Sequence, residues 1–237
     1  MFVKSVSRIA KHETRLHGSI RINGTASVPI GIHDLQSFRE WARSDDYPER
    51  GDFCWLGNIF WVDLSMEEAF THGAVKTELV TVINSICKAK DLGKVFVDAM
   101  RVSNPDANLS CEPDVMLVLY ESFASGAVRQ IEGSKPGSVI EFEGAPDLIV
   151  EIISDSSEEK DLELLPERLF TAGVKEYWVV DARAEKLLFE IYRRGPKSFV
   201  KSPMRSGRVR SQVLGYAFKL TRGLDRGGLP TYELAYS

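Results

Sequence analysis

The chain lacks any apolar run near the ~20 residues that a membrane-spanning helix needs, so we expect no contact with a membrane. Its first eight residues also lack the apolar segment of a secretory signal peptide, which favours a cytoplasmic protein. Hydrophobic residues make up 43% of the 237 residues, too many for a disordered chain. This length suits one domain of ordinary size with a small appendage.

Cysteine is scarce, and the three cysteines show no pairing pattern. Cys54, Cys87 and Cys111 are odd in number, widely spaced and without a Cys-x-x-Cys motif. This spacing argues against both a disulfide framework and a structural zinc site. We expect buried free thiols.

Charge is unevenly distributed along the chain. Residues 1–30 carry a net charge of +4 and residues 191–237 a net charge of +8, whereas residues 31–190 carry −16. Basic ends could bind nucleic acid or an acidic partner, or they could simply cover the acidic body electrostatically. A pI near 5.7 does not favour an avid, non-specific DNA-binding protein.

Hydrophobic periodicity predicts an α/β or α+β fold, with a mixed sheet flanked by helices. Residues 1–30 show little periodicity and suggest a loose or partner-bound arm, and residues 198–220 are basic with short apolar patches. The other predicted elements are helices at 34–44, from about 65 or 67 to 90, and at 162–172; hairpins at 53–63 and 127–143; and strands at 93–102, 115–120, 148–153, 176–181 and 187–193.

Two acidic residues stand at predicted strands that should lie inside the sheet. Glu151 is embedded in the apolar run Leu-Ile-Val-Glu-Ile-Ile, and Asp114 follows Pro113 just before another apolar run. A buried carboxylate is costly unless it is paired or bound to a metal. Two carboxylates on neighbouring strands are also a common way to hold Mg²⁺ against a phosphodiester. We therefore expect Asp114 and Glu151 to be metal ligands close enough to share one cation.

Several motifs together resemble the Uma-type restriction endonucleases, a branch of the PD-(D/E)XK nuclease superfamily. The residues that carry the resemblance are Gly144-Ala-Pro-Asp-Leu-Ile-Val-Glu-Ile-Ile-Ser154, Asp161, and Ala172-Gly-Val-Lys-Glu-Tyr-Trp-Val-Val-Asp181. Thr71-His72 and Pro113-Asp114 are in register with the same pattern. The likeness extends over roughly residues 50 to 220, and its Gly-Val-x-Glu-Tyr-Trp-x-Val-Asp run is specific.

The resemblance implies a restriction-endonuclease-like core, with a central mixed β-sheet flanked by helices. It implies three segments: an N-terminal arm and short helix at 1–48, the nuclease-like domain at 49–220, and a C-terminal tail at 221–237. It further implies Mg²⁺ or Mn²⁺ held by Asp114 and Glu151, DNA as the partner, and association as a homodimer.

The chain departs from the family pattern at the lysine that would polarise the attacking water. The two positions where relatives carry this lysine are Ile153 and Leu165 here, and neither side chain can do that chemistry. Lys160 becomes the third candidate catalytic residue, placed in a loop from which it could swing inward. Arg168 is an alternative that could hold a phosphate but, being always protonated, could not act as a base.

Simpler interpretations compete for the remaining candidates. We expect His72 to be a helix-start residue satisfied by a backbone group, Glu78 to be a solvated helix residue, and Asp155 and Asp161 to cap the loop after Glu151. The aromatic residues are expected to pack in the core or on a sheet face, not to stack on bases: Trp55, Phe60, Trp61 and Trp178.

Three functions remain open from the sequence. The first is a metal-dependent endonuclease that hydrolyses DNA phosphodiester bonds. The second is a catalytically silent relative that keeps the nuclease fold as a nucleic-acid-binding or protein-interaction module after losing its lysine. The third is a dimerising structural protein whose basic ends serve protein partners.

Overall fold

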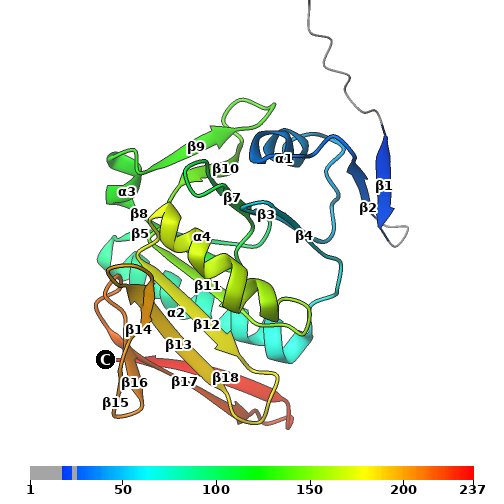
Figure 1. The fold of residues 1–237 in the computed structure, drawn as a ribbon. Coiled ribbons are helices and arrows are strands. Elements are labelled where there is room, and N and C mark those ends of the chain that lie inside the picture. Colours follow the sequence, from blue (N-terminus) through cyan, green and yellow to red (C-terminus); the bar gives the residue numbers. More distant parts are fainter. Residues whose placement is uncertain (1–17, 23–25) are drawn as a thin grey trace, which may run out of the picture. The chain divides into compact units, whose positions relative to one another are not determined.

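A computed structural model describes residues 18–22 and 26–237 (Figure 1). These residues fall into two compact units. The first unit ends at Pro48 and the second runs from Glu49 to Ser237. Within the described residues no helix is long and apolar enough to cross a membrane.

The first unit contains a short hairpin and one helix. Strands β1 (Ser19–Ile22) and β2 (Ala26–Pro29) pair antiparallel, a hairpin that the sequence analysis did not predict. Helix α1 (Leu35–Ala42) confirms the predicted helix, and Asp34 caps it by accepting the Ser37 amide in a capping box. The rest of the expected arm, residues 1–17 and 23–25, lies outside the described residues.

Three sheets build the second unit, and the central one carries the motifs that the sequence singled out. Its strand order is β14-β13-β12-β11-β8-β5. A second sheet has the order β4-β3-β7-β6-β10-β9, and a third has the order β15-β16-β17-β18. The central strands are β5 (Gly93–Val97), β8 (Val115–Leu119), β11 (Leu148–Ile152), β12 (Glu176–Asp181), β13 (Leu188–Arg194) and β14 (Phe199–Lys201).

The other two sheets are built from strands that lie on either side of the central motifs in the sequence. The second sheet contains β3 (Asp52–Leu56), β4 (Ile59–Asp63), β6 (Arg101–Asn104), β7 (Leu109–Cys111), β9 (Val128–Glu132) and β10 (Val139–Gly144). The third contains β15 (Met204–Arg205), β16 (Arg208–Arg210), β17 (Ala217–Leu224) and β18 (Pro230–Tyr236). The predicted hairpins at 53–63 and 127–143 are thereby confirmed as β3–β4 and β9–β10.

Strand β11 lies in the middle of the central sheet, parallel to β12 and antiparallel to β8. Successive side chains of a strand point to opposite faces, so β11 supplies both hydrophobic cores. Leu148, Val150 and Ile152 belong to one core, whereas Ile149 and Ile153 belong to the other. Glu151 therefore points to the same face as Ile149 and Ile153.

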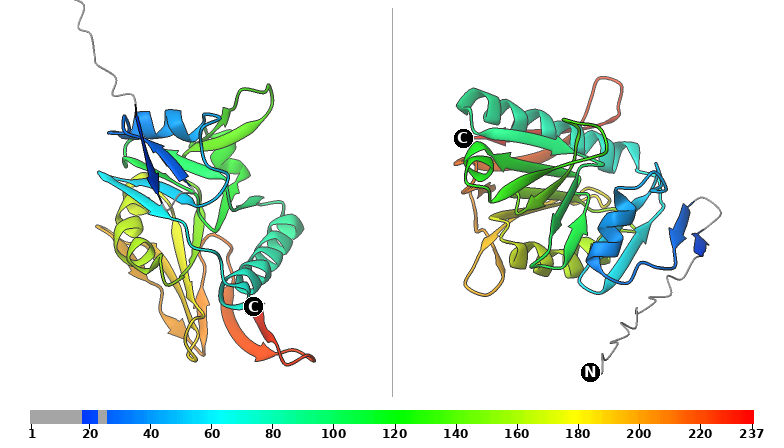
Figure 2. Two further views of the ribbon diagram at one scale, coloured as in Figure 1. Left: turned by 90° about the vertical axis from the view of Figure 1, so that its right-hand side faces the viewer. Right: turned by 90° about the horizontal axis from the view of Figure 1, so that it is seen from above.

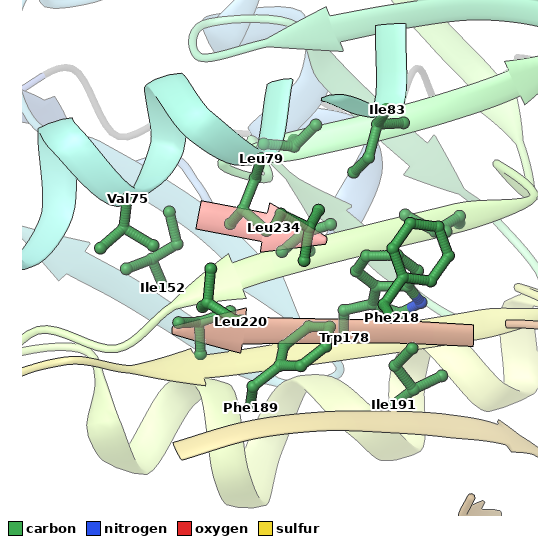
Figure 3. Close-up of a cluster of buried hydrophobic side chains, with 14 of the residues drawn as sticks. Val75, Leu79, Ile83, Ile152, Trp178, Phe189, Ile191, Phe218, Leu220 and Leu234 are labelled. Atoms are coloured by element: carbon green, nitrogen blue, oxygen red, sulfur yellow. The ribbon is translucent and has the colours of Figure 1, made fainter. Parts of the chain in front are cut away.

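The first core lies between the central sheet, helix α2 (Val75–Lys90) and the β17–β18 hairpin (Figure 3). Val75, Leu79 and Ile83 recur along one face of α2 and confirm the predicted apolar stripe. Figure 2 shows α2 running beside β17 and β18. On these strands the buried residues alternate with exposed ones, as a sheet covered on one face requires.

The second core lies on the opposite face, against helix α4 (Leu165–Ala172). Leu165 and Leu169 are fully buried there, and Gly173 ends the helix in the left-handed conformation. Pro166 stands in the first turn of α4, where its missing N–H costs nothing. A π-helical turn, η2 (Lys160–Leu164), leads into α4.

Three segments differ from the sequence prediction. Residues 221–237, expected as a tail, complete β17 and form β18, and Tyr232 and Leu234 are buried in the first core. The single strand expected at 93–102 is divided into β5 and β6, which belong to different sheets. Asp98 and Ala99 adopt positive φ angles between them, and this turn redirects the chain. A short helix, α3 (Tyr120–Ala124), follows β8 and was also not predicted.

The buried carboxylate of Glu176 joins the central sheet to the segment before β17. It accepts hydrogen bonds from the Trp178 indole, the Ser211 hydroxyl, and the Gln212 and Val213 amides. Hydrogen bonds to a charged group contribute more to folding stability than bonds between neutral groups do. A buried donor that loses its acceptor also costs its own desolvation free energy.

Glu176→Ala should therefore lower the free energy of unfolding by about 3 kcal/mol or more, since each orphaned donor costs about 1–3 kcal/mol. Urea unfolding followed by circular dichroism measures the change. Glu185→Ala, at an exposed position, is the matched control and should shift stability by less than about 0.5 kcal/mol. Equal midpoints for the two variants would mean that Glu176 does not tie these segments together.

Candidate metal centre

Asp114 and Glu151 lie at adjoining ends of strands β8 and β11. Val115 pairs with Val150 in the antiparallel register. Asp114 precedes Val115 and Glu151 follows Val150, so this register places the two acids opposite each other. The Ile152 amide donates a hydrogen bond of 2.7 Å to Asp114 Oδ2. Both side chains are shielded from solvent, with 13% of Asp114 and 3% of Glu151 exposed. The sequence prediction that Glu151 is buried is confirmed.

Two basic side chains reach Asp114 from the segment that opens helix α2. His72 belongs to the π-helical turn η1 (Ala69–Ala74), and its Nε2 lies 3.3 Å from Asp114 Oδ2. Lys76 belongs to α2, and its Nζ lies 3.1 Å from Asp114 Oδ1. Burial alone raises the pKa of Asp114, but His72, Lys76 and the Ile152 amide together lower this pKa to about 2. Asp114 is therefore a carboxylate at neutral pH.

His72 lies between two carboxylates, which differs from the expected backbone partner. Its Nδ1 is 3.3 Å from Glu67 Oε2, on the side opposite Asp114. Burial lowers the pKa of His72, yet the hydrogen bond and charge of Asp114 outweigh it and hold the pKa above its usual value. The expectation of a simple helix-start residue is wrong, because the imidazole is turned inward.

Lys76 connects three acids in the same cluster. Besides Asp114, its ammonium lies 2.7 Å from Glu67 Oε1 and 2.5 Å from Asp98 Oδ1. Burial lowers the pKa of Lys76, but the surrounding carboxylates raise it well above its ordinary value. The lysine is therefore a fixed positive charge.

Lys160 reaches Glu151 from the second core. It is the first residue of η2, not a loop residue as predicted, and its side chain is already buried at 5% exposure. Its Nζ lies 3.7 Å from Glu151 Oε2, 3.1 Å from Asp52 Oδ2 and 3.3 Å from Asp161 Oδ1. Burial opposes the charge on Lys160, yet the three acids raise its pKa well above the usual value. The third predicted residue thus meets the predicted acid.

Buried carboxylate oxygens around Lys160 outnumber the donors that could satisfy them. Glu151 Oε1 and both Asp161 carboxylate oxygens have no hydrogen-bond partner among the described residues. Burial raises the pKa of Glu151 well above its ordinary value, with Lys160 opposing the rise and Asp161 and Asp114 adding to it. Burial likewise raises the pKa of Asp161 to about 6. Such unsatisfied buried oxygens call for a partner, and a bound cation is a partner that suits carboxylates.

Other predicted candidates lie elsewhere. Ile153 and Leu165 are buried and apolar, so neither replaces the missing lysine. The Arg168 guanidinium packs against Gly57, and its Cζ lies 3.0 Å from the position that a Cβ on residue 57 would occupy. Glu78 accepts the Leu234 amide at 2.8 Å and so anchors β18 instead of being solvated.

The structure also tests the predictions made for the capping acids, for Trp178 and for the cysteines. Asp155 pairs with Arg183, and Ser154 and Ser157 cap the loop after Glu151 by exchanging amide-to-hydroxyl hydrogen bonds. Asp161 points inward instead of capping. Trp178 packs in the first core, as expected (Figure 3). The three cysteines are buried free thiols, also as expected.

Four residues of the cluster were not predicted from the sequence: Asp52, Glu67, Lys76 and Asp98. One signal could have identified Lys76. It follows His72 by four residues, a spacing that places both side chains on one helix face. Asp52 and Asp98 reach their lysines over separations of 108 and 22 residues, and no local pattern encodes such contacts.

Comparisons with known proteins agree with the fold. A family model, Uma2, described as "Putative restriction endonuclease", matches residues 57–221. Among solved structures, the chain is similar to a "putative nuclease belonging to DUF820" from Anabaena variabilis, with a TM-score of 0.56 and 17% sequence identity. That match covers 77% of this chain and 90% of the other. A search of curated proteins found no match.

The ionic contacts of Lys160 generate a prediction about stability. Lys160→Met should lower the free energy of unfolding by about 3–5 kcal/mol, because it leaves Glu151, Asp52 and Asp161 without their shared cation. Adding Glu151→Gln to this variant should restore part of the loss, since one uncompensated charge is then removed. A double-mutant cycle measured by urea unfolding gives the coupling energy.

The matched control for that cycle is Lys186→Met, at an exposed position, which should change stability by less than about 0.5 kcal/mol. A coupling energy near zero between positions 160 and 151 would show that the two side chains do not interact.

Proposed function

Because the chain belongs to the Uma2 restriction-endonuclease family, we propose that it is a divalent-metal-dependent nuclease that hydrolyses DNA phosphodiester bonds. The observation that carries this proposal is the unpartnered oxygen of Glu151, a buried carboxylate whose neighbours across the strand pair include Asp114. In this proposal Asp114 and Glu151 are the metal ligands.

The donor set fits a hard divalent cation. Mg²⁺ and Mn²⁺ prefer carboxylate oxygens together with water, and Asp114 and Glu151 supply the carboxylate oxygens. Burial and the negative charges of Asp52, Asp114 and Asp161 raise the pKa of Glu151. The Lys160 ammonium, 3.7 Å from Glu151 Oε2, is the cation that opposes this rise. A bound divalent ion would offset this excess of negative charge and satisfy Glu151 Oε1.

When bound, the metal would lower the pKa of a water molecule and stabilise negative charge on the phosphate. The role of Lys160 follows from its own surroundings. Its raised pKa keeps it protonated, so it would donate hydrogen bonds to a water or a phosphate oxygen instead of removing a proton. Asp52 would hold the ammonium in place from β3.

DNA is the proposed partner because the basic residues near the C-terminal end remain accessible. Arg205 and Arg210, on the β15–β16 hairpin, are exposed and can contact phosphates. We also propose that the protein acts in the cytoplasm and associates as a homodimer. The proposed segments are an arm at 1–48 and a nuclease-like domain at 49–237 that includes β17 and β18.

A second candidate function is a catalytically silent nuclease-fold protein that binds nucleic acid or protein. One observation favours it: each proposed metal ligand already has a lysine beside it that offsets part of its negative charge. Lys76 pairs with Asp114, and Lys160 pairs with Glu151. If these contacts persist in solution, no metal is needed to keep the acids buried.

Cleavage assays on plasmid and single-stranded DNA with Mg²⁺ or Mn²⁺ separate the two functions. An active enzyme should lose at least ~100-fold in rate on Lys160→Ala, the lower end for a positioned catalytic group. Glu151→Gln should abolish cleavage. Lys186→Ala, at an exposed position, is the matched control and should cut like the wild type.

A wild type that binds DNA or metal but cuts nothing would favour the silent module. In that case Leu165→Lys restores the lysine at the family position, and a gain of metal-dependent cleavage would show that the remaining site is competent. Cleavage that is unchanged in Lys160→Ala would refute the role assigned to this lysine.

A further inference from the structure

We propose that Glu67, His72 and Asp114 form a distinct metal site that selects a transition ion such as Mn²⁺ or Zn²⁺ over Mg²⁺. The proposal shares Asp114 with the nuclease function above but depends on neither Glu151 nor Lys160. The two proposals can therefore fail independently.

The geometry of the three side chains suits a common ion. One ligand atom from each lies within 4.8 Å of the other two. The Nδ1 of His72 is 3.3 Å from Glu67 Oε2, and the Nε2 of the same ring is 3.3 Å from Asp114 Oδ2. A histidine binds an ion through one ring nitrogen, and ligands bound to one ion at about 2.1 Å lie about 3–3.5 Å from one another. Because the three ligand atoms are up to 4.8 Å apart, the cluster would close around an ion by a shift of the carboxylates toward that nitrogen.

The His72 ring supplies an independent indication of a ligand. Its side chain is 9% exposed, and its Nδ1 has no hydrogen-bond partner in the described part of the chain. A buried ring nitrogen that faces a carboxylate without a hydrogen bond is an unsatisfied polar atom, and such atoms call for an explanation. Coordination of an ion between the two groups would satisfy it.

The local charge balance favours a divalent ion. Three carboxylates, those of Glu67, Asp98 and Asp114, surround the single ammonium of Lys76. With His72 neutral, as a metal ligand must be, this group carries a net charge of −2. One divalent cation would neutralise it while Lys76 keeps its contact with Asp98.

The mixture of ligands determines the class of metal. Mg²⁺ prefers oxygen ligands alone, whereas an imidazole nitrogen favours Mn²⁺, Zn²⁺ and other transition ions. The side chain of Glu67 is 56% exposed, which gives an ion a path from solvent to the otherwise buried His72 and Asp114. A site with only three protein ligands also leaves positions for water.

Electron paramagnetic resonance with Mn²⁺ tests the assignment on the full, untagged chain. Titration of the free Mn²⁺ signal measures affinity, and electron spin echo modulation detects a directly bound imidazole nitrogen. The wild type should bind Mn²⁺ and show this nitrogen modulation. Excess Mg²⁺ should displace the ion poorly.

Variants identify the ligands. His72→Ala should remove the nitrogen modulation and weaken this binding at least 10-fold, because even partners of a ligand contribute 10–100-fold. Glu67→Gln should weaken it similarly, and its exposed position makes it a safeguard if His72→Ala fails to fold. His33→Ala, at an exposed histidine, is the matched control and should behave like the wild type.

Glu151→Gln makes the outcome distinguishable from that of the nuclease proposal. Nitrogen-coupled Mn²⁺ that persists in Glu151→Gln supports this site whether or not the protein cleaves DNA. Mn²⁺ binding without nitrogen modulation, no Mn²⁺ binding by the wild type, or unchanged binding in both Glu67→Gln and His72→Ala would overturn the assignment.

Discussion

The candidate centre depends on the hydrogen bond that the Ile152 amide donates to the Asp114 carboxylate, because this bond holds the acid in place. It joins the end of β11 to the residue before β8, and Asp114 in turn holds His72 and Lys76 from the start of α2. A carboxylate buried among apolar strands is stable only with such partners. The same contact therefore fixes the helix, both strands and the orientation of the acid.

Two apolar cores on opposite faces of the central sheet create the electrostatic conditions of the site. Val75 and Ile152 belong to one core, and Ile153 and Leu165 belong to the other. The buried ionisable residues of the site are His72, Lys76, Glu151, Lys160 and Asp161. In such surroundings the interaction between two charges is weakened less than it is in water. Each lysine is consequently paired with several acids, and the affinity for a further cation depends on how much negative charge remains uncompensated.

The sequence predicted those parts of the molecule that repeat locally and missed those that depend on distant contacts. The apolar run around Glu151 has no face available to solvent, which made its burial predictable. The β17–β18 hairpin had a usable signal, the period-two alternation of Phe218 and Leu220, which its basic residues obscured. The sequence predicted that Lys160 could turn inward but placed it in a loop, whereas it begins a π-helical turn. Its pairing with Asp52 spans 108 residues, and no local pattern encodes such a contact.

The most direct test of the central claim is a crystal structure of the protein soaked in Mn²⁺, with anomalous diffraction used to locate the ion. The account predicts an anomalous peak within about 2.2 Å of carboxylate oxygens from both Asp114 and Glu151, the usual metal–oxygen distance. A structure in which Glu151 contacts only Lys160 and no peak lies beside it at saturating Mn²⁺ would contradict the account.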